Sequence, residues 1–488
     1  MGQVLWTLRS LIVRHPLLVV FVSALLIRLA FSFYFQQFYF GCFVFKYFDS
    51  RSYFDPILNL INHGTYIGDW YLEDSKYFRV PVYPAFLGLV HLIFGSAYFD
   101  YAVAFLQSVI DAFSALLVYK ILFIVSGSSR TALWSGLLYA TYPFIVLWSP
   151  IRYTEILQTF LIFLLLYMVL TSTRSKKSLL LQGALAGVLV LTKQYLGLMI
   201  LVPLFTMLFS EKRENVPGKL ISGLMLLIGM GIVLSPWVSR NYVHSGEVIV
   251  LKGETTGLRD RGPDFEAFER FANLFNENIT PMFYGIAFHG KTTFEKHAAF
   301  VDRHRSEIDA AVQKAHECGT SFMEIREKTT GGPPHTGCDQ EVARGFEKLT
   351  RTFWREVPFI EALETRRDAL KKIVLKSDIS YKNIAFSNAQ LFKTALFKYR
   401  VLLLALGLIG IVFLLGNGVA CGNRPFVLGV ALTAMAFYAF FALVIVHVEM
   451  RYLLLPDLLI SIFAPVAVAV LAGKMKRTGA NRTPEHGK

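Results

Sequence analysis

The topology of this chain is decided by residues 81–95, which read PVYPAFLGLVHLIFG. The stretch is apolar, but it is shorter than the roughly 20 residues that an α-helix needs to cross a bilayer. Whether it spans the membrane or lies along its surface fixes the side on which every later loop emerges. The distribution of charge along the rest of the chain answers this question.

Ten other stretches are apolar with few charges, and we predict that each crosses the membrane. They are residues 17–35, 98–122, 131–149, 153–172, 179–192, 195–209, 218–238, 398–416, 426–446 and 452–472. Of the 488 residues, 54% are hydrophobic and only 17% are charged, whereas about a quarter of a soluble chain is charged. This composition excludes a disordered chain, and four cysteines are too few for a disulfide-based fold.

The basic residues favour an interfacial position for residues 81–95. With that position and a cytoplasmic N-terminus, the inner connections and the two termini together hold 15 basic and 3 acidic residues. The large outer connection 239–397 holds 23 basic and 22 acidic residues, so nearly all of the net charge of +14 lies on the inner face. Cytoplasmic loops carry such an excess of Lys and Arg. We therefore predict both termini in the cytoplasm, a plasma membrane of bacterial type, and no nucleic-acid partner, because no basic soluble surface remains.

The predicted fold is an all-α integral membrane protein with about ten transmembrane helices. Residues 1–238 form an N-terminal membrane module whose first outer loop, 36–97, carries interfacial helices. Residues 239–397 form a large, mainly helical extracytoplasmic loop, with amphipathic helices over 294–315 and 341–356. Residues 398–472 form the C-terminal transmembrane helices, and residues 473–488 form a basic cytoplasmic tail.

Two residue pairs give more specific expectations. Arg28 and Asp111 both fall inside apolar spans, where a charge costs on the order of 3 kcal/mol on insertion scales. We predict that they pair between the first and second spans. Cys318 and Cys338 lie in the large outer loop, where an oxidising exterior favours a disulfide between them.

The first outer loop holds the residues with chemical interest. Asp55 before Pro56 indicates a helix start and Gly64 a helix end, so a short helix is expected to lie on the bilayer. Asp49 has no structural role of this kind. Arg79 precedes the interfacial segment near headgroup level. An acid and an arginine at the outer interface are suited to deprotonating a hydroxyl and holding a lipid phosphate, respectively.

Four short patterns follow one another along the chain. They are Asp49 with Tyr53, Gly64, Tyr66 and the Arg79-x-Pro81-x-Tyr83-Pro84 run; Arg152-Tyr153-Thr154-Glu155; Pro236-Trp237 with Arg240-Asn241-Tyr242; and Arg451-Tyr452 with Pro456. As an ordered set they resemble the GT-C glycosyltransferases, in particular the protein-mannosyltransferase and aminoarabinose-transferase branch. The resemblance covers roughly residues 17–242 and 426–472. Pro56, Ile57 and the connection 239–397 depart from the family pattern and leave the substrate open.

The resemblance implies an enzyme that takes a sugar from a polyprenyl-phosphate donor and passes it, with inversion, to a lipid, glycan or protein hydroxyl at the outer face. The implied catalytic residues are Asp49, as general base, and Glu155, which orients acceptor or sugar. The implied substrate-binding residues are Tyr53, Arg79, Tyr83, Arg240 and Arg451. Arg79 would stabilise the charge that develops on the departing phosphate.

Other interpretations stay open at this point. Glu155 has Arg152 as an alternative partner, and Arg79, Arg240 and Arg451 also suit simple anchoring at span ends. The chain is alternatively a lipid or solute transporter, or a ligase or polymerase of pyrophosphate-linked glycans. His447 and Glu449 alone make no metal site, so we expect no obligatory metal, with a divalent ion as the alternative.

Overall fold

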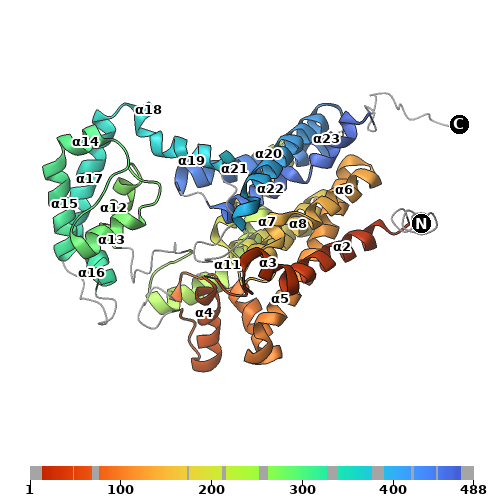
Figure 1. Ribbon diagram of the computed structural model, residues 1–488, viewed down its shortest axis with the longest axis horizontal. Helices are drawn as coiled ribbons and strands as arrows, with labels where there is room; N and C mark the ends of the chain where they lie inside the picture. The colour runs from red at the N-terminus through yellow and green to blue at the C-terminus, as the bar shows by residue number, and fades with distance from the viewer. Residues whose placement is uncertain are drawn as a thin grey trace.

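The computed structural model describes residues 14–47, 49–68, 76–172, 175–210, 216–251, 262–326, 338–375, 389–418, 423–446 and 449–473. Within these ranges the chain forms helices, turns and loops but no β-strand, which confirms the all-α prediction. Figure 1 shows two parts: a large bundle of helices, and a smaller group formed by α12 to α18 on its left. The predicted tail 473–488 lies outside the described residues except for Gly473.

The bundle contains the apolar helices. Its elements are α2 (Pro16–Ala30), η1 (Phe31–Phe35), α3 (Gln36–Phe40), α4 (Ser50–His63), α5 (Val82–Ser126), α6 (Ser129–Ala140), α7 (Pro143–Val146), α8 (Glu155–Thr171), α9 (Lys176–Val190), η3 (Gln194–Ile200), α10 (Leu201–Leu208), α11 (Val216–Ser245), α20 (Ala389–Phe413), η4 (Leu414–Gly418), α21 (Arg424–Ala439), η6 (Phe440–Val444), α22 (Met450–Ser461) and α23 (Ala464–Leu471). In the described chain, six continuous helical stretches are long and apolar enough to cross a membrane, and two shorter apolar helices accompany them. The protein is therefore a multi-pass membrane protein. The start of α2 and the end of α23 lie on the same side of the bundle, away from α12 to α17 (Figure 1).

Residues 81–95 form a helix that joins the next span at a sharp bend. The helix α5 continues through both segments, but Gly95 has φ 66° and ψ 173°, a conformation that only glycine adopts without strain. The short apolar segment and the span 98–122 are thus two helices that meet at Gly95. The bend lets the first helix take a direction different from that of the span.

Two predicted helix boundaries are wrong. The span 131–149 is interrupted after Ala140 and resumes at Pro143, because the residue before a proline prefers an extended conformation and Tyr142 adopts one. The predicted last span, 452–472, agrees with the continuous stretch Met450–Leu471, within which α22 and α23 meet. Helix α4 begins at Ser50, so Asp55 is not its N-cap and Pro56 lies inside the helix.

Glycines allow α9 and α11 to approach closely. A side-chain carbon built on Gly183 would lie 2.0 Å from the Leu226 carbonyl oxygen, and one on Gly229 would lie 2.1 Å from that of Leu180. Small residues at such crossings are typical of helix pairs in membranes. This contact fixes the position of α11, which carries Arg240, relative to the C-terminal end of α9, which Lys193 follows.

Two fully buried ion pairs hold the bundle together. Arg28 on α2 pairs with Asp111 on α5, as predicted, and the Tyr139 hydroxyl of α6 donates to the same carboxylate. A second pair was not predicted: Arg400 Nε on α20 donates to Asp457 Oδ2 on α22 at 2.5 Å. Each carboxylate also has a tyrosine partner, which satisfies the polar atoms that burial removes from water.

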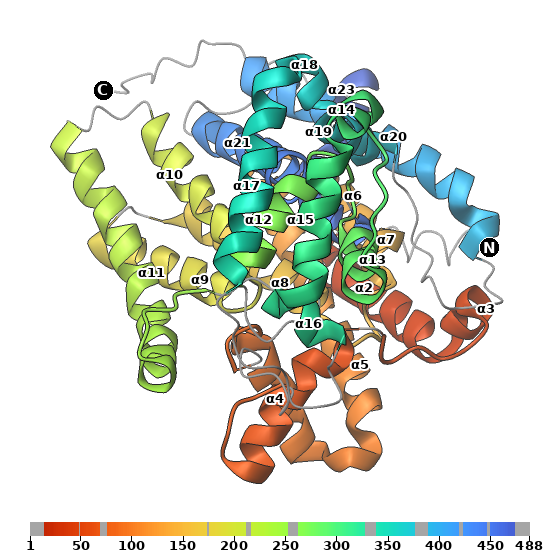
Figure 2. The ribbon, with the colours of Figure 1, turned by 90° about the vertical axis from the view of Figure 1, so that its left-hand side faces the viewer.

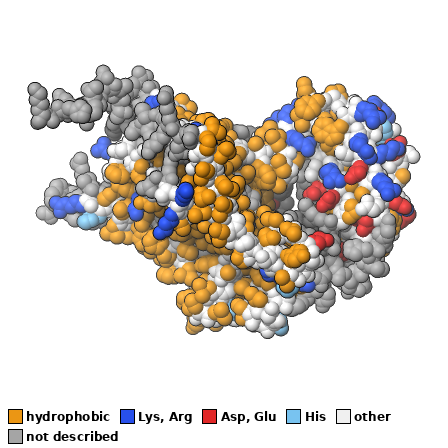
Figure 3. Space-filling view, turned by 180° about the vertical axis from the view of Figure 1, so that it is seen from behind, with side chains coloured by type: hydrophobic (Ala, Val, Ile, Leu, Met, Phe, Trp, Pro, Cys, Tyr) orange, Lys and Arg blue, Asp and Glu red, His pale blue; other side chains and the backbone are white. Residues whose placement is uncertain are grey.

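The smaller part has its own core and a charged surface. Its helices are α12 (Pro263–Ala272), α13 (Thr280–His289), α14 (Ala298–Arg303), α15 (Arg305–Cys318), α16 (Thr320–Arg326), α17 (Asp339–Glu356) and α18 (Phe359–Ala362), and α19 (Glu364–Leu375) leads back to the bundle. Helices α15 and α17 lie side by side (Figure 2). Phenylalanines from this group of helices, among them Phe268, Phe275 and Phe346, form the core. The predicted disulfide Cys318–Cys338 is present. Figure 3 shows Lys, Arg, Asp and Glu side chains gathered on this part, while the surface of the bundle is mainly hydrophobic.

Candidate active site

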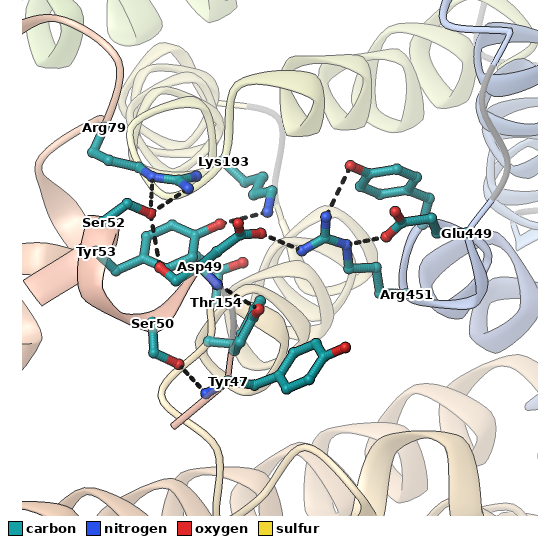
Figure 4. A network of polar contacts seen from close by, with 12 residues as sticks. Tyr47, Asp49, Ser50, Ser52, Tyr53, Arg79, Thr154, Lys193, Glu449 and Arg451 are labelled. Carbon is teal, nitrogen blue, oxygen red and sulfur yellow. Dashed lines mark hydrogen bonds and ion pairs between the residues drawn. The ribbon is translucent and has the colours of Figure 1, made fainter. Parts of the chain in front are cut away.

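Asp49 lies in the loop 36–97, where this loop meets Tyr153 and Arg451 of the bundle. It occupies the N-cap position of α4, but its side chain makes no capping hydrogen bond. Its Oδ2 atom instead accepts a hydrogen bond of 2.8 Å from Arg451 Nη1, and its backbone N–H donates to the Tyr153 hydroxyl at 3.0 Å. The Asp49 side chain is 23% exposed, so the carboxylate is held on one side and accessible on another (Figure 4).

Arg451 comes from the other end of the chain, at the second residue of α22. Its Nε donates to Glu449 Oε2 at 2.5 Å, and its guanidinium lies over the rings of Tyr153 and Tyr452. The planar group therefore has fixed partners along its edge and on its face. Such packing orients the atom that reaches Asp49.

A second group of side chains surrounds Tyr53, one turn further along α4. Lys193 Nζ donates to the buried Tyr53 hydroxyl at 2.6 Å, and the Arg79 guanidinium carbon lies 4.0 Å from the centre of the Tyr53 ring. Arg79 Nε also donates to Ser52 Oγ at 2.9 Å, and that hydroxyl donates to the Asp49 carbonyl oxygen at 2.7 Å. Figure 4 shows both cations beside Asp49 and Tyr53.

The two cations change the pKa of the Tyr53 hydroxyl. Burial alone would raise the pKa of Tyr53, but the positive charges of Arg79 and Lys193 hold it below its usual value, against the opposing charge of Glu155. The site is therefore electrically positive at the Tyr53 hydroxyl. A positive, partly dehydrated position of this kind favours an anionic ligand.

The sequence analysis missed Lys193. Helix α9 ends at Val190, and Lys193 follows in an extended conformation with φ −157° and ψ 125°, which turns its side chain into the site. A signal was present, because in the predicted topology Lys193 stands at the outer end of its span. Basic residues are depleted on the outer side of the membrane, so a lysine predicted there between two apolar stretches indicates a functional role.

Glu155 begins α8 and is fully buried. Among the described residues, neither of its carboxylate oxygens has a hydrogen-bond partner. The alternative pairing with Arg152 is wrong, because Arg152 Nε lies 3.2 Å from Asp100 Oδ1 instead. Glu155 is close enough to act electrostatically on Tyr53, which places a second acid next to the group around Asp49.

Tyr83 and Arg240 take less direct positions. Tyr83 is buried and donates a hydrogen bond to Gln107 Oε1 at 2.9 Å. It packs edge-on against the Tyr53 ring and so helps to hold that ring in place. Arg240 donates to the carbonyl oxygens of Lys76 and Tyr66 at 2.7 and 2.9 Å. These two partners belong to the loop 36–97, a third is Asn241 Oδ1 at 3.0 Å, and in the described structure none of them belongs to the Asp49–Arg451 pair.

Arg240 also lines a cavity of about 410 Å³ between α4, α9 and α11, whose wall includes Leu60, Tyr66 and Trp237. The described residues contain no group of three or more His, Cys, Asp or Glu side chains that could hold a metal ion. His447 lies outside the described residues, and Glu449 bonds to Arg451.

Comparison with known proteins gives a partial match. Residues 79–239, about a third of the chain, match the family model described as dolichyl-phosphate-mannose-protein mannosyltransferase. A search among curated proteins found no match. One similar solved structure is that of ArnT from Cupriavidus metallidurans bound to undecaprenyl phosphate, with 14% identity, coverage of 93% of this chain and 78% of that chain, and a TM-score of 0.36.

The matched segment contains Arg79, Glu155 and Lys193, and therefore part of the candidate site, and it ends one residue before Arg240. Asp49 and Arg451 lie outside it and are brought to it by the fold. The family match confirms the resemblance to GT-C mannosyltransferases that the loop motifs indicated.

Proposed function

We propose that this protein is a membrane glycosyltransferase that moves a sugar from a polyprenyl-phosphate donor to an acceptor hydroxyl on the outer face of the membrane. One observation carries the proposal: an accessible carboxylate, Asp49, lies among Arg79, Lys193 and Arg451 at one end of the membrane helices. Such a transfer needs a base that accepts the hydroxyl proton and cations that stabilise the charge on the departing phosphate. The family match over residues 79–239 supports the reaction class.

In the proposed reaction Asp49 accepts the proton of the attacking hydroxyl. The hydroxyl oxygen forms a bond to the anomeric carbon while the bond from that carbon to the phosphate oxygen breaks. Attack from the side opposite the leaving group inverts the anomeric configuration. The bond from Arg451 keeps the carboxylate of Asp49 in one orientation, and a positioned base of this kind contributes about 10²–10⁴-fold to the rate.

Arg79 and Lys193 receive the departing phosphate. Lys193 bonds to the Tyr53 hydroxyl and Arg79 to the Ser52 hydroxyl, so each faces a neutral group that a phosphate oxygen can replace. Charge that develops on the phosphate is stabilised more strongly in a water-poor site than in water. The apolar cavity beside Arg240 and Trp237 is open at the same outer level and is suited to the first isoprene units.

The orientation belongs to the same proposal. An excess of basic residues in the short connections supports cytoplasmic termini in a bacterial-type plasma membrane, with the first loop and α12 to α18 outside. Glu155, buried with both oxygens unbonded among the described residues, is suited to hydroxyl groups of the sugar. We assign no obligatory metal to the reaction.

The direct test is the release of polyprenyl phosphate from labelled undecaprenyl-phosphate sugars by the purified full-length chain in lipid nanodiscs. We expect release by the wild-type protein, loss with Asp49→Asn, and normal release with Asp55→Asn, a matched acid in the same helix. Transport of the intact donor without release would show a transporter. Consumption of only pyrophosphate-linked glycans would show a ligase or polymerase, and either result would overturn the proposal.

A further inference from the structure

The helices α18 and α19 connect the smaller part to the bundle and belong to both cores. Ala362 of α18 lies in the core of the smaller part, whereas Ala369 and Ile373 of α19 lie in the core of the bundle. Figure 1 shows α19 between the smaller part and α21. This connection lies outside the segment 79–239 that matches the family model, so its surroundings have to be inferred from its own residues.

Helix α19 packs against the end of a membrane helix. Arg366 Nε donates to the carbonyl oxygen of Leu443 at 3.3 Å, and Leu443 is the second-last residue of the apolar helical stretch Arg424–Val444. The side chains of Leu443 and Val444 are exposed. A stretch of this length and composition crosses the hydrocarbon of the bilayer, so its end, and α19 with it, lies near the level where lipid meets water.

The same connection exposes large apolar side chains. Phe359 and Ile360, at the start of α18, are 69% and 79% exposed. The ring of Trp354, which is also exposed, lies 6.5 Å from that of Phe359. We call Trp354, Phe359 and Ile360 the apolar tip, and exposed Leu370 adds a further apolar side chain on α19. Exposed apolar side chains that cluster in this way mark surfaces that bind a membrane or a protein.

The charged residues of the connection are largely paired with one another. Residues 359–375 contain four basic and three acidic residues. Arg367 Nη2 lies 3.2 Å from Glu364 Oε1, and Lys371 Nζ lies 3.2 Å from Asp368 Oδ1. The connection therefore has little net charge to attract a charged partner. Its exposed apolar side chains decide what it binds.

The membrane is the partner that fits these side chains. Through the contact between Arg366 and Leu443, α19 continues the exposed apolar surface of α21 and η6, which lipid covers in a multi-pass membrane protein. Tryptophan is enriched where proteins cross the headgroup level, and the apolar tip contains Trp354 beside Phe359. Short helices with exposed apolar side chains also lie in the interface of a bilayer.

We propose that α18 and the adjacent side of α19 insert into the membrane leaflet at the end of the bundle that carries Arg451. The apolar tip then lies among the headgroups and the first acyl carbons of that leaflet. The contact is with the bilayer as a whole and needs no particular headgroup. It anchors the smaller part beside the bundle, and it does not depend on which reaction the protein catalyses.

The test measures the surroundings of a spin label on Ile360→Cys in the full-length protein in phosphatidylcholine nanodiscs. Cys42→Ser and Cys421→Ser remove the two cysteines outside the disulfide Cys318–Cys338. Collisions of the label with oxygen, which concentrates in lipid, are compared with collisions with a neutral nickel chelate, which stays in water. The ratio of the two collision rates reports whether the label lies in lipid or in water.

Two control positions calibrate this ratio. Leu402→Cys places the label on an exposed residue of the apolar stretch Phe392–Gly416, in lipid. Asp309→Cys places it on an exposed residue of α15, on the side of the smaller part away from the bundle (Figure 1). We expect the ratio of oxygen to nickel collisions at Ile360→Cys to exceed that at Asp309→Cys about fivefold or more, because its surroundings are lipid.

The other outcomes contradict the proposal. Equal ratios at Ile360→Cys and Asp309→Cys would place the apolar tip in water. Slow collisions with both reagents would show that protein covers it, and dipolar coupling between labels would identify that protein as a second copy. A high ratio that requires added phosphatidylglycerol would show electrostatic binding in place of an apolar contact.

Hydrogen exchange provides a second measurement without a label. Phe359→Ser with Ile360→Ser removes two exposed apolar side chains, so the core of the smaller part stays intact. In nanodiscs we expect the backbone amides of residues 359–375 to exchange about tenfold faster in this double variant than in the wild type, because the anchored helices open less often. The control Asp309→Ser with Lys348→Ser should leave these rates unchanged. Equal rates in Phe359→Ser with Ile360→Ser and in the wild type would overturn the proposal.

Discussion

Asp49 and Arg451 are separated by 402 residues in the sequence, yet Asp49 Oδ2 and Arg451 Nη1 lie 2.8 Å apart. If Asp49 is the base and Arg451 orients it, Asp49→Asn should lower kcat by about 10²–10⁴-fold with little change in the KM for the donor. Arg451→Lys should retain part of kcat and Arg451→Met less. Steady-state kinetics of the single and double variants measure the coupling, and strictly additive effects would contradict a shared role.

Lys193 provides a second kinetic prediction. Its bond to the Tyr53 hydroxyl at 2.6 Å places it where the donor phosphate is expected to bind, and hydrogen bonds to charged groups contribute about 1.5–3 kcal/mol. Lys193→Met should therefore raise the KM for the donor by about 10–100-fold. Lys348→Met serves as the charge-matched control for donor binding, because Lys348 is an exposed residue of α17 away from the candidate site. An unchanged KM in Lys193→Met, measured by polyprenyl phosphate release, would remove Lys193 from the phosphate site.

The pair Arg28–Asp111 is predicted to be structural. Both side chains are fully buried, and removal of one partner from a buried pair costs about 3–5 kcal/mol because the other charge stays behind. Arg28→Met and Asp111→Leu should each strongly reduce accumulation and thermal stability, and the double variant should recover part of the loss. A double variant no better than either single variant would contradict the pairing in the membrane.

The disulfide Cys318–Cys338 should stabilise the helices α12 to α17. It closes a loop with a sequence separation of 20, for which chain entropy gives about 3 kcal/mol. Reduction, or Cys318→Ser with Cys338→Ser, should lower the melting temperature of the full-length protein and expose α15 and α17 to proteases. Cys42→Ser is the control, since Cys42 is exposed and forms no disulfide.

A pH effect is expected from Asp264. Burial raises its pKa, although hydrogen bonds from Ser321 oppose the shift, whereas an unfolded aspartate titrates near 3.9. At a pH between the unfolded pKa and the raised folded pKa, the folded state holds a proton that the unfolded state lacks. The free energy of unfolding therefore increases as the pH falls through the folded pKa of Asp264, and it decreases as the pH rises. Melting temperatures between about pH 4 and 7 should show a smaller contribution of this sign in Asp264→Asn; an identical pH profile would contradict it.

The positions of the apolar helices could be predicted because apolar length depends on sequence segments alone. It located the six long apolar stretches and the two shorter apolar helices of the described chain. The interfacial position of residues 81–95 and the cytoplasmic termini, inferred from the basic residues, stay predictions. The pairing of Arg28 with Asp111 could be predicted because an unpaired charge in hydrocarbon has an unfavourable free energy. Cys318 and Cys338 followed from their shared loop.

The details of the site could not be predicted, because its contacts join residues that are far apart in the sequence. The partner of Asp49 is 402 residues away, and nothing in a single sequence distinguishes Arg451 from Arg240, which bonds instead to backbone carbonyl groups of the first loop. The start of α4 was misplaced because Asp55-Pro56 is a common helix start, whereas tertiary contacts begin the helix six residues earlier. Arg400 and Asp457 lie near the ends of predicted spans, where charged residues are common. Nothing in the sequence therefore indicated that they form a pair.

The last helix pair has a consequence for how the protein matures. Arg451 enters with α22, 402 residues after Asp49 in the sequence. Until α22 is in place, the carboxylate at the start of α4 lacks the guanidinium that holds it in the folded chain. A chain that stops before α22, or fails to insert it, is therefore expected to carry Asp49 without its orienting partner.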